Sequence, residues 1–156
     1  MITIEEVMTT KLHTLSEKDS LQDAIQLMAD KHIRHIPIVD AKGKLTGIVS
    51  HGDVLAATDS TLHAQDERQS PASVPISKIM TRDVATVDEN ASLRSAARYL
   101  ERYKYGCLPV VTKGKLKGII TDSDFIAVAI DLLEQLEEME RDTSDDYEET
   151  ESPEDY

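Results

Sequence analysis

The sequence contains a single cysteine, Cys107, no tryptophan and only one phenylalanine among its 156 residues. One cysteine excludes an intramolecular disulfide, and this scarcity is typical of proteins in a reducing compartment. No run of 18 or more apolar residues occurs, so we expect no segment that spans a membrane. The first six residues lack a basic region followed by an apolar run, so we expect no secretion signal and a cytoplasmic location.

Positive charge is also scarce, and the formal net charge is -13. Residues 131–156 contain 13 acidic residues and one basic residue, Arg141, whereas the first 130 residues contain 17 acidic and 16 basic ones. A body so close to neutral has no basic surplus for a broad duplex-binding face, and an acidic tail repels phosphates. The charge pattern therefore predicts that the protein does not bind nucleic acid.

The sequence repeats itself. Residues 42–48 and 113–119 agree at six of seven positions, with the pattern Lys-Gly-Lys-Leu-x-Gly-Ile. Further matches surround them, pairing Met8-Thr9 with Met80-Thr81, Pro37 with Pro109, and Asp53 with Asp124. Agreement at so many spaced positions indicates two copies of one structural unit.

Each copy has the same predicted elements. A short helical turn ends near Met8 or Met80, and an extended piece follows at 12–15 or 84–87. The next helix begins after Ser20, which forms a capping-box pattern with Asp23. Two strands come next. They span 36–39 and 45–50 in the first copy, and 108–111 and 116–121 in the second copy. The first strand of each copy contains a proline. The proline predicts an edge or strand-start position. A last helix begins at residue 51 or 122.

We therefore predict an α+β fold of two tandem β-α-β-β-α repeats. One repeat is too small to bury its own faces, so the two should pack about a pseudo-twofold axis. The predicted boundaries are 1–58 for the first repeat, 59–75 for a linker, and 76–130 for the second repeat. A helical extension over 131–141 and a disordered acidic tail over 142–156 complete the chain.

The two copies resemble the CBS (cystathionine β-synthase) domain family. The resemblance rests on the paired Met-Thr starts, on the apolar-Pro-apolar-Val strands, and above all on Gly-apolar-apolar-Ser/Thr-x-x-Asp, which spans 47–53 and 118–124. It covers roughly residues 3–130. Such a resemblance implies a pair that binds an adenosine-type ligand, namely AMP, ADP, ATP or S-adenosylmethionine, and that regulates a partner without catalysis or a required cofactor.

The residues of the motif suit a nucleotide. A carboxylate can accept hydrogen bonds from both ribose hydroxyls, and a helix N-terminus favours its ionised form. The predicted ribose-binding residues are Asp53, Asp124, Ser50 and Thr121. Apolar residues of the first and second strands would flank the base, namely Leu12, Ile36, Val84 and Leu108.

Phosphates need positive charge or polar donors, and the predicted contacts are Arg34, His35 and Ser123. Gly106 and Cys107 stand where Arg34 and His35 stand in the first copy, so the two clefts are chemically unequal. The sequence does not decide which cleft is occupied.

Simpler roles fit some of these residues. Asp53 and Asp124 can act as capping residues of their helices, and Arg34 can be a solvated surface arginine. His32 and His35 lack the acidic or cysteine neighbours of a metal site, so we expect no bound metal. No pattern of a catalytic nucleophile or of a phosphate-cradling loop occurs.

The last helix carries an apolar stripe at spacings of 4, 3, 4 and 3, formed by Phe125, Ala129, Leu132, Leu136 and Met139. This stripe packs on its own domain or forms a homodimer contact. Our leading hypothesis is an adenine-nucleotide sensor that acts on a separate protein. The alternatives are a structural or dimerisation module with empty clefts and, less favoured, a nucleotide-processing enzyme.

Overall fold

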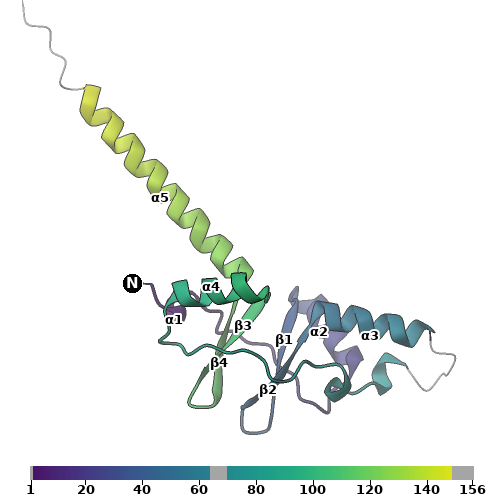
Figure 1. The fold of residues 1–156 in the computed structure, drawn as a ribbon. Helices are drawn as coiled ribbons and strands as arrows, with labels where there is room; N and C mark the ends of the chain where they lie inside the picture. Colours follow the sequence, from purple (N-terminus) through teal and green to yellow (C-terminus); the bar gives the residue numbers. More distant parts are fainter. Residues whose placement is uncertain (1, 64–69, 149–156) are drawn as a thin grey trace, which may run out of the picture. The chain divides into compact units, whose positions relative to one another are not determined.

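A computed structural model of the protein describes residues 2–63 and 70–148. The chain forms two compact units, which we describe separately. The first, Met1–Thr121, holds both repeats up to the last strand. The second, from Asp122 onward, contains the long helix α5 (Asp122–Glu148), which Figure 1 shows as one uninterrupted helix.

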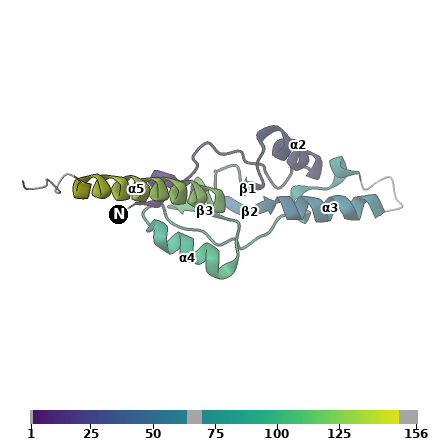
Figure 2. The same ribbon diagram turned by 90° about the horizontal axis from the view of Figure 1, so that it is seen from above.

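The first repeat contains five elements. They are α1 (Ile4–Val7), α2 (Leu21–Lys31), β1 (His35–Val39), β2 (Leu45–Ser50) and α3 (His51–His63). Strands β1 and β2 form an antiparallel hairpin, and α2 and α3 lie together beside it (Figure 2).

The second repeat follows the same order. The short 3-10 helices η2 (Pro71–Ser73) and η3 (Ile76–Lys78) precede α4 (Leu93–Tyr103), which leads to the antiparallel strands β3 (Cys107–Thr112) and β4 (Lys115–Thr121). The predicted α+β architecture of two tandem repeats is confirmed.

The predicted helix starts are found where the sequence signals place them. Ser20 caps α2, because its hydroxyl accepts from the Asp23 N–H at 3.2 Å while Asp23 Oδ2 accepts from the Ser20 N–H at 2.8 Å. Helix α2 ends at Lys31 and α4 ends at Tyr103. The residues that follow, His32 and Lys104, have the left-handed conformation that commonly stops a helix.

The predicted extended piece at 12–15 contributes a single parallel bridge, in which the Leu15 N–H donates to the Pro37 carbonyl and the Val39 N–H donates to Leu15. Val87 makes the equivalent bridge in the second repeat. Each sheet therefore has two full strands and one isolated bridge on the far side of the first strand.

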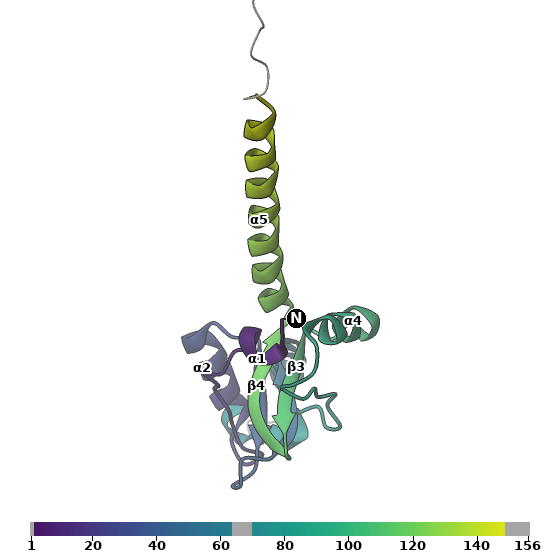
Figure 3. The ribbon, with the colours of Figure 1, turned by 90° about the vertical axis from the view of Figure 1, so that its left-hand side faces the viewer.

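The two repeats complete each other's sheets. Thr9 exchanges two backbone hydrogen bonds with Ile119 of β4, at 2.9 and 3.0 Å, and Thr81 does the same with Ile48 of β2, at 3.0 and 2.8 Å. Figure 3 shows the start of the chain, around α1, beside β4. These reciprocal contacts are the pseudo-twofold relationship that the repeat predicts.

The crossed pairing explains the strand prolines. Pro37 lies in the middle of β1, not at its start, and it faces Ile48. The backbone groups of Ile48 bond to Thr81, so no ladder bond needs an N–H from Pro37. Pro109 faces Ile119 in the same way, and Ile119 bonds to Thr9.

Two glycines allow the crossing segments to approach. A Cβ on Gly47 would lie 2.6 Å from the Thr81 carbonyl oxygen and would also meet the Met80 side chain. A Cβ on Gly118 would lie 2.6 Å from Met8 Sδ and 3.0 Å from the Thr9 carbonyl oxygen. Both glycines of the repeated motif therefore serve the contact between the repeats.

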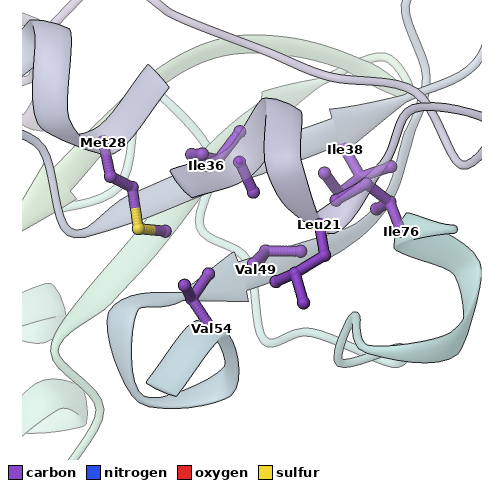
Figure 4. Packing of buried hydrophobic residues seen from close by; sticks show 8 residues of the cluster. Leu21, Met28, Ile36, Ile38, Val49, Val54 and Ile76 are labelled. Atoms are coloured by element: carbon purple, nitrogen blue, oxygen red, sulfur yellow. The ribbon is translucent and has the colours of Figure 1, made fainter. Parts of the chain in front are cut away.

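A closed apolar core lies in the first repeat, in which side chains from α2, β1, β2 and α3, together with Ile76 of η3, point toward one another (Figure 4). Leu21, Ile36, Ile38, Val49 and Ile76 are fully buried. A second cluster contains Ile48, Cys107 and Ile119, with Leu12 and Val84 packed against it, and so joins the two repeats. Cys107 is buried there.

Two predicted boundaries need correction. Helix α3 continues past Thr58 to His63, because no glycine or proline interrupts it there, so the predicted linker begins inside a helix. Helix α5 continues past residue 141 to Glu148, so the start of the predicted disordered tail is helical. The rest of that tail, 149–156, lies outside the described residues, as do 64–69 of the linker.

Candidate functional site

The motif of the first repeat lies where β2 passes directly into α3. The Ser50 N–H donates to Asp53 Oδ2 at 2.9 Å, and the Asp53 N–H donates to Ser50 Oγ at 3.1 Å. The two side chains thus form a reciprocal cap on the first turn of α3. Among the described residues, Asp53 Oδ1 accepts no hydrogen bond, so one carboxylate oxygen can receive a ligand while the other caps the helix.

Asp53 lies at one end of a groove of about 510 Å³. One wall is α3, through Ala56, Ala57, Ser60 and Thr61, and the other is the segment from Ser73 to Ile79. Lys78, at the end of η3, is the cation among the lining residues. A carboxylate and an ammonium in one groove can bind a ligand that has both hydroxyl and anionic groups. Sequence reasoning missed Lys78, although its place just before the Met80-Thr81 start was a usable signal.

The predicted phosphate contacts of the first repeat lie elsewhere. Arg34 does not line the groove of Asp53; it lines a second groove, between α2 and α3. His35 is half-buried at the start of β1, where its Nε2 lies 3.0 Å from the position that a Cβ on Gly106 would take. The small residue in the second repeat therefore leaves room for the histidine ring of the first.

The predicted base-binding residues divide into two pairs. Leu12 and Val84 pack at the contact between the repeats and remain partly exposed. Ile36 and Leu108 are fully buried, so their side chains offer no surface to a ligand in this structure. The difference arises because Ile36 and Leu108 belong to β1 and β3, in which consecutive residues on both faces are buried.

In the second repeat, the motif spans the two units. Thr121 is the last residue of the first unit, and Ser123 and Asp124 lie in the first turn of α5. The Ser123 N–H donates to Asp122 Oδ1 at 2.9 Å. The grouping of Thr121, Ser123 and Asp124 around a second ligand stays a prediction.

Other kinds of site find no support in the described part of the chain. Residues 2–63 and 70–148 contain no group of three or more His, Cys, Asp or Glu side chains arranged to hold a metal ion. None of the helices within these ranges combines the length and the apolar character needed to cross a membrane.

A family model for the CBS domain matches residues 4–60 and 76–131. The chain belongs to the CBS domain family and contains two copies of the domain.

Solved structures share this fold over most of their length. A chain named as an acetoin utilization protein (AcuB) from Vibrio cholerae is 47% identical, with a TM-score of 0.77, and the match covers 88% of this chain and 97% of that one. CBSX2 of Arabidopsis thaliana, solved with AMP, is 30% identical with a TM-score of 0.73, over 85% and 98% of the two chains. The CBS domain pair of MJ0100, solved with 5'-methylthioadenosine and S-adenosyl-L-methionine, is 26% identical with a TM-score of 0.71, over 82% and 95%.

Curated relatives differ in length. A homoserine O-acetyltransferase of Methanohalophilus mahii is 35% identical over 130 residues, which cover 83% of this chain but only 24% of that protein. A CBS domain-containing protein of Dictyostelium discoideum is 28% identical over 137 residues, which cover 85% and 94% of the two. The chain thus spans about a quarter of the acetyltransferase.

Proposed function

We propose that this protein is a non-catalytic regulatory module that binds an adenine nucleotide and acts on a separate protein. The observation that carries the proposal is the carboxylate of Asp53, which is held by Ser50 and lines a groove that Lys78 also lines. Relatives solved with AMP and with S-adenosyl-L-methionine support an adenosine-type ligand.

The chemistry of the groove fits such a ligand. The Oδ1 atom of Asp53 accepts a hydrogen bond from a ribose hydroxyl, and Ser50 keeps the carboxylate in place. The ammonium of Lys78 binds a phosphate. Leu12 and Val84 do not line this groove; they are partly exposed where the repeats meet, and they stay our proposed base contacts there. Thr121, Ser123 and Asp124 are our proposed ligand contacts in the second repeat. Arg34 and His35 lie outside the groove of Asp53, so they would supply positive charge only to a ligand bound elsewhere.

A thermal-shift panel tests the proposal. The purified protein is heated with AMP, ADP, ATP, S-adenosylmethionine, NAD or GTP, because a ligand that binds the native state raises the unfolding midpoint. At 100 times its dissociation constant, a ligand adds about 2.7 kcal/mol to the free energy of unfolding. We expect an adenosine ligand to raise the unfolding midpoint of the protein. The rise should be much smaller for the variants Asp53→Asn and Asp124→Asn.

The matched control is Asp30→Asn, which changes an exposed carboxylate on α2 away from the groove. This variant should respond to the ligand as the unchanged protein does. An unfolding midpoint that no compound raises at millimolar concentration would contradict the proposal and favour the structural or dimerisation module with empty clefts. Chemical turnover of the added nucleotide would favour the nucleotide-processing enzyme.

A further inference from the structure

Helix α4 carries an exposed row of arginines. Arg94, Arg98 and Arg102 follow one another at intervals of four residues, so they lie along one side of the helix, and all three are exposed. Within residues 2–63 and 70–148, no acidic side chain forms an ion pair with any of them. The row therefore presents three cations whose charge the described part of the chain leaves unmatched.

Three exposed tyrosines lie together at the C-terminal end of the same helix. The ring centroids of Tyr99 and Tyr103 are 4.6 Å apart, and the ring of Tyr105 lies 6.1 and 6.0 Å from them. Their side chains are 38%, 48% and 47% exposed. The Arg102 guanidinium lies 5.6 Å from the centroid of the Tyr103 ring and so joins the row to the rings. We call the three arginines and three tyrosines together the arginine–tyrosine surface.

The first repeat lacks this surface. Its helix α2 corresponds to α4, and Figure 2 shows the two helices on opposite sides of the strands. At the repeat offset of 72, Gln22, Gln26 and Asp30 stand where α4 has its arginines. The Gln26 amide donates to Asp30 at 2.9 Å, so this row of α2 contains its own hydrogen-bond partners. No tyrosine occurs on α2.

Packing does not account for the difference between the two helices. Both bury side chains at three equivalent positions, which are Leu21, Ala24 and Met28 in α2 and Leu93, Ala96 and Leu100 in α4. The same contact with the strands is therefore made with and without the arginines and tyrosines. These six residues are available for another molecule.

We propose that the arginine–tyrosine surface binds an acidic segment of a separate protein. This surface rests on the proposed action on a separate protein and names the chemistry of that partner. Successive arginines of the row are about 6 Å apart along the helix axis, so carboxylates at every fourth position of a partner helix match their spacing. Each guanidinium donates two parallel hydrogen bonds to a carboxylate, and the tyrosines supply rigid rings and hydroxyl donors.

Charge favours an acidic protein segment over a nucleic acid. The first 130 residues have 17 acidic and 16 basic residues, and the remainder of the chain is strongly acidic. A long phosphate backbone would meet three favourable cations and then a repulsive surface, whereas a short segment contacts the row alone. Tyrosine and arginine are also among the side chains that most often dominate the binding energy of protein interfaces.

Fluorescence anisotropy with a designed peptide tests the proposal. The probe is a labelled, alanine-based helical peptide with three glutamates spaced four residues apart, and a second probe has glutamine at the same positions. We expect the full chain to bind the glutamate probe at least about tenfold more tightly than the glutamine probe, and less tightly as salt is added. Replacing Arg94, Arg98 and Arg102 together by glutamine should weaken binding of the glutamate probe about tenfold or more.

A charge-matched control separates the row from the net charge. Replacing Lys42, Lys113 and Lys115 together by glutamine removes the same charge from exposed positions in and beside the hairpin turns. This variant should bind the glutamate probe as the unchanged protein does. The double variant Tyr103→Ala, Tyr105→Ala should bind it more weakly, because the rings of the surface are lost. Unfolding midpoints establish that each variant is folded.

Four results would overturn the proposal. Equal losses in the arginine and lysine variants would show that binding follows net charge. Tighter binding of a single-stranded oligothymidylate than of the glutamate probe would assign the surface to nucleic acid. A dimer in sedimentation velocity that the arginine variant abolishes would assign it to a contact between copies. A folded protein that does not bind the glutamate probe, while AMP still raises its unfolding midpoint, would remove this partner surface and leave the nucleotide proposal intact.

Discussion

Ser50 and Asp53 hold each other by two hydrogen bonds, from the Ser50 N–H to Asp53 Oδ2 and from the Asp53 N–H to Ser50 Oγ. The capping role and the proposed ligand role of Asp53 are therefore compatible, because they use different oxygens of one carboxylate. The cap would fix the side chain before a ligand bound, which would lower the conformational entropy lost on binding.

The two roles can be separated by substitution. Asp53→Ala removes the cap and the charge and should lower the free energy of unfolding by about 1 kcal/mol. Asp53→Asn keeps an oxygen for the Ser50 N–H and should cost less, yet both should weaken AMP binding at least about tenfold, the loss of one charge-assisted hydrogen bond. Urea unfolding and titration calorimetry measure the two effects. Normal AMP binding by Asp53→Asn would leave capping as the role of this residue.

Lys78 should determine whether the ligand carries phosphate. Lys78→Gln removes the cation that lines the groove of Asp53. We expect weaker binding of AMP and ATP, and little change for adenosine, because only a phosphate gains from the ammonium group. Calorimetry with the three compounds measures the difference. Equal losses for adenosine and AMP would place the phosphate elsewhere, with Arg34 and His35 as the next residues to change.

The motif glycines should be needed for folding. Gly47→Ala and Gly118→Ala place a methyl group against the segment that crosses from the other repeat, so each should destabilise the protein by about 1–3 kcal/mol. Gly52→Ala is the matched control, because its Cβ would lie 3.7 Å from Ser50 Oγ in ordinary contact. Gly52 lies in α3, where alanine should be neutral or stabilising. Similar denaturation midpoints for all three variants would contradict this account.

The turn of the first hairpin should weaken in acid. The backbone N–H of Lys44, and that of Lys42 to a lesser extent, lowers the pKa of Asp40 below its ordinary value of 3.8. Because the folded-state pKa is lower than the unfolded one, this stabilisation is complete above the ordinary value and is lost as the pH falls through the folded one. The stability difference between the protein and Asp40→Asn should therefore stay constant well above the ordinary value of 3.8 and shrink as the pH falls below it. Asp30→Asn controls for the loss of one negative charge, and a constant difference would contradict the account.

The ion pair between the repeats should contribute little. Arg82 Nη1 and Glu17 Oε1 are 2.7 Å apart, but their side chains are 52% and 38% exposed. Water and salt screen such a pair, so a double-mutant cycle with Arg82→Gln and Glu17→Gln should give a coupling of about 0.2–1 kcal/mol that falls with added salt. A coupling well above this range would show that charge, as well as backbone pairing, holds the repeats together.

Local signals explain what the sequence could predict of the fold. The Ser20 cap and the two apolar strands of each repeat depend on residues close together in the chain, and each was found where expected. The ends of α3 and α5 were harder to predict. Neither Thr58 nor Arg141, where the helices were expected to end, is followed by a glycine or proline that would stop a helix. The pairing of Thr9 with Ile119 joins distant residues, and no local pattern predicts such a partner.

In the candidate site too, contacts between neighbours in the chain could be predicted, whereas contacts between distant segments could not. The link between Ser50 and Asp53 spans three residues and follows from the motif itself. Which side chains line the groove depends on how distant segments pack. For that reason Lys78 was missed, and Ile36 was expected at a surface although it is fully buried.

The crossed pairing of Thr9 and Thr81 also bears on how the chain is made. The first repeat leaves the ribosome before Ile119 exists, so the segment around Thr9 must wait for most of the second repeat to be synthesised. Until then Met8 cannot pack against Gly118, and the outer edge of β2 lacks the backbone hydrogen bonds of Thr81. An unpaired strand edge invites association with other chains. A ribosome that stalls between the repeats would therefore hold a chain whose first sheet still has an unpaired edge, and such a chain would need protection from other nascent chains.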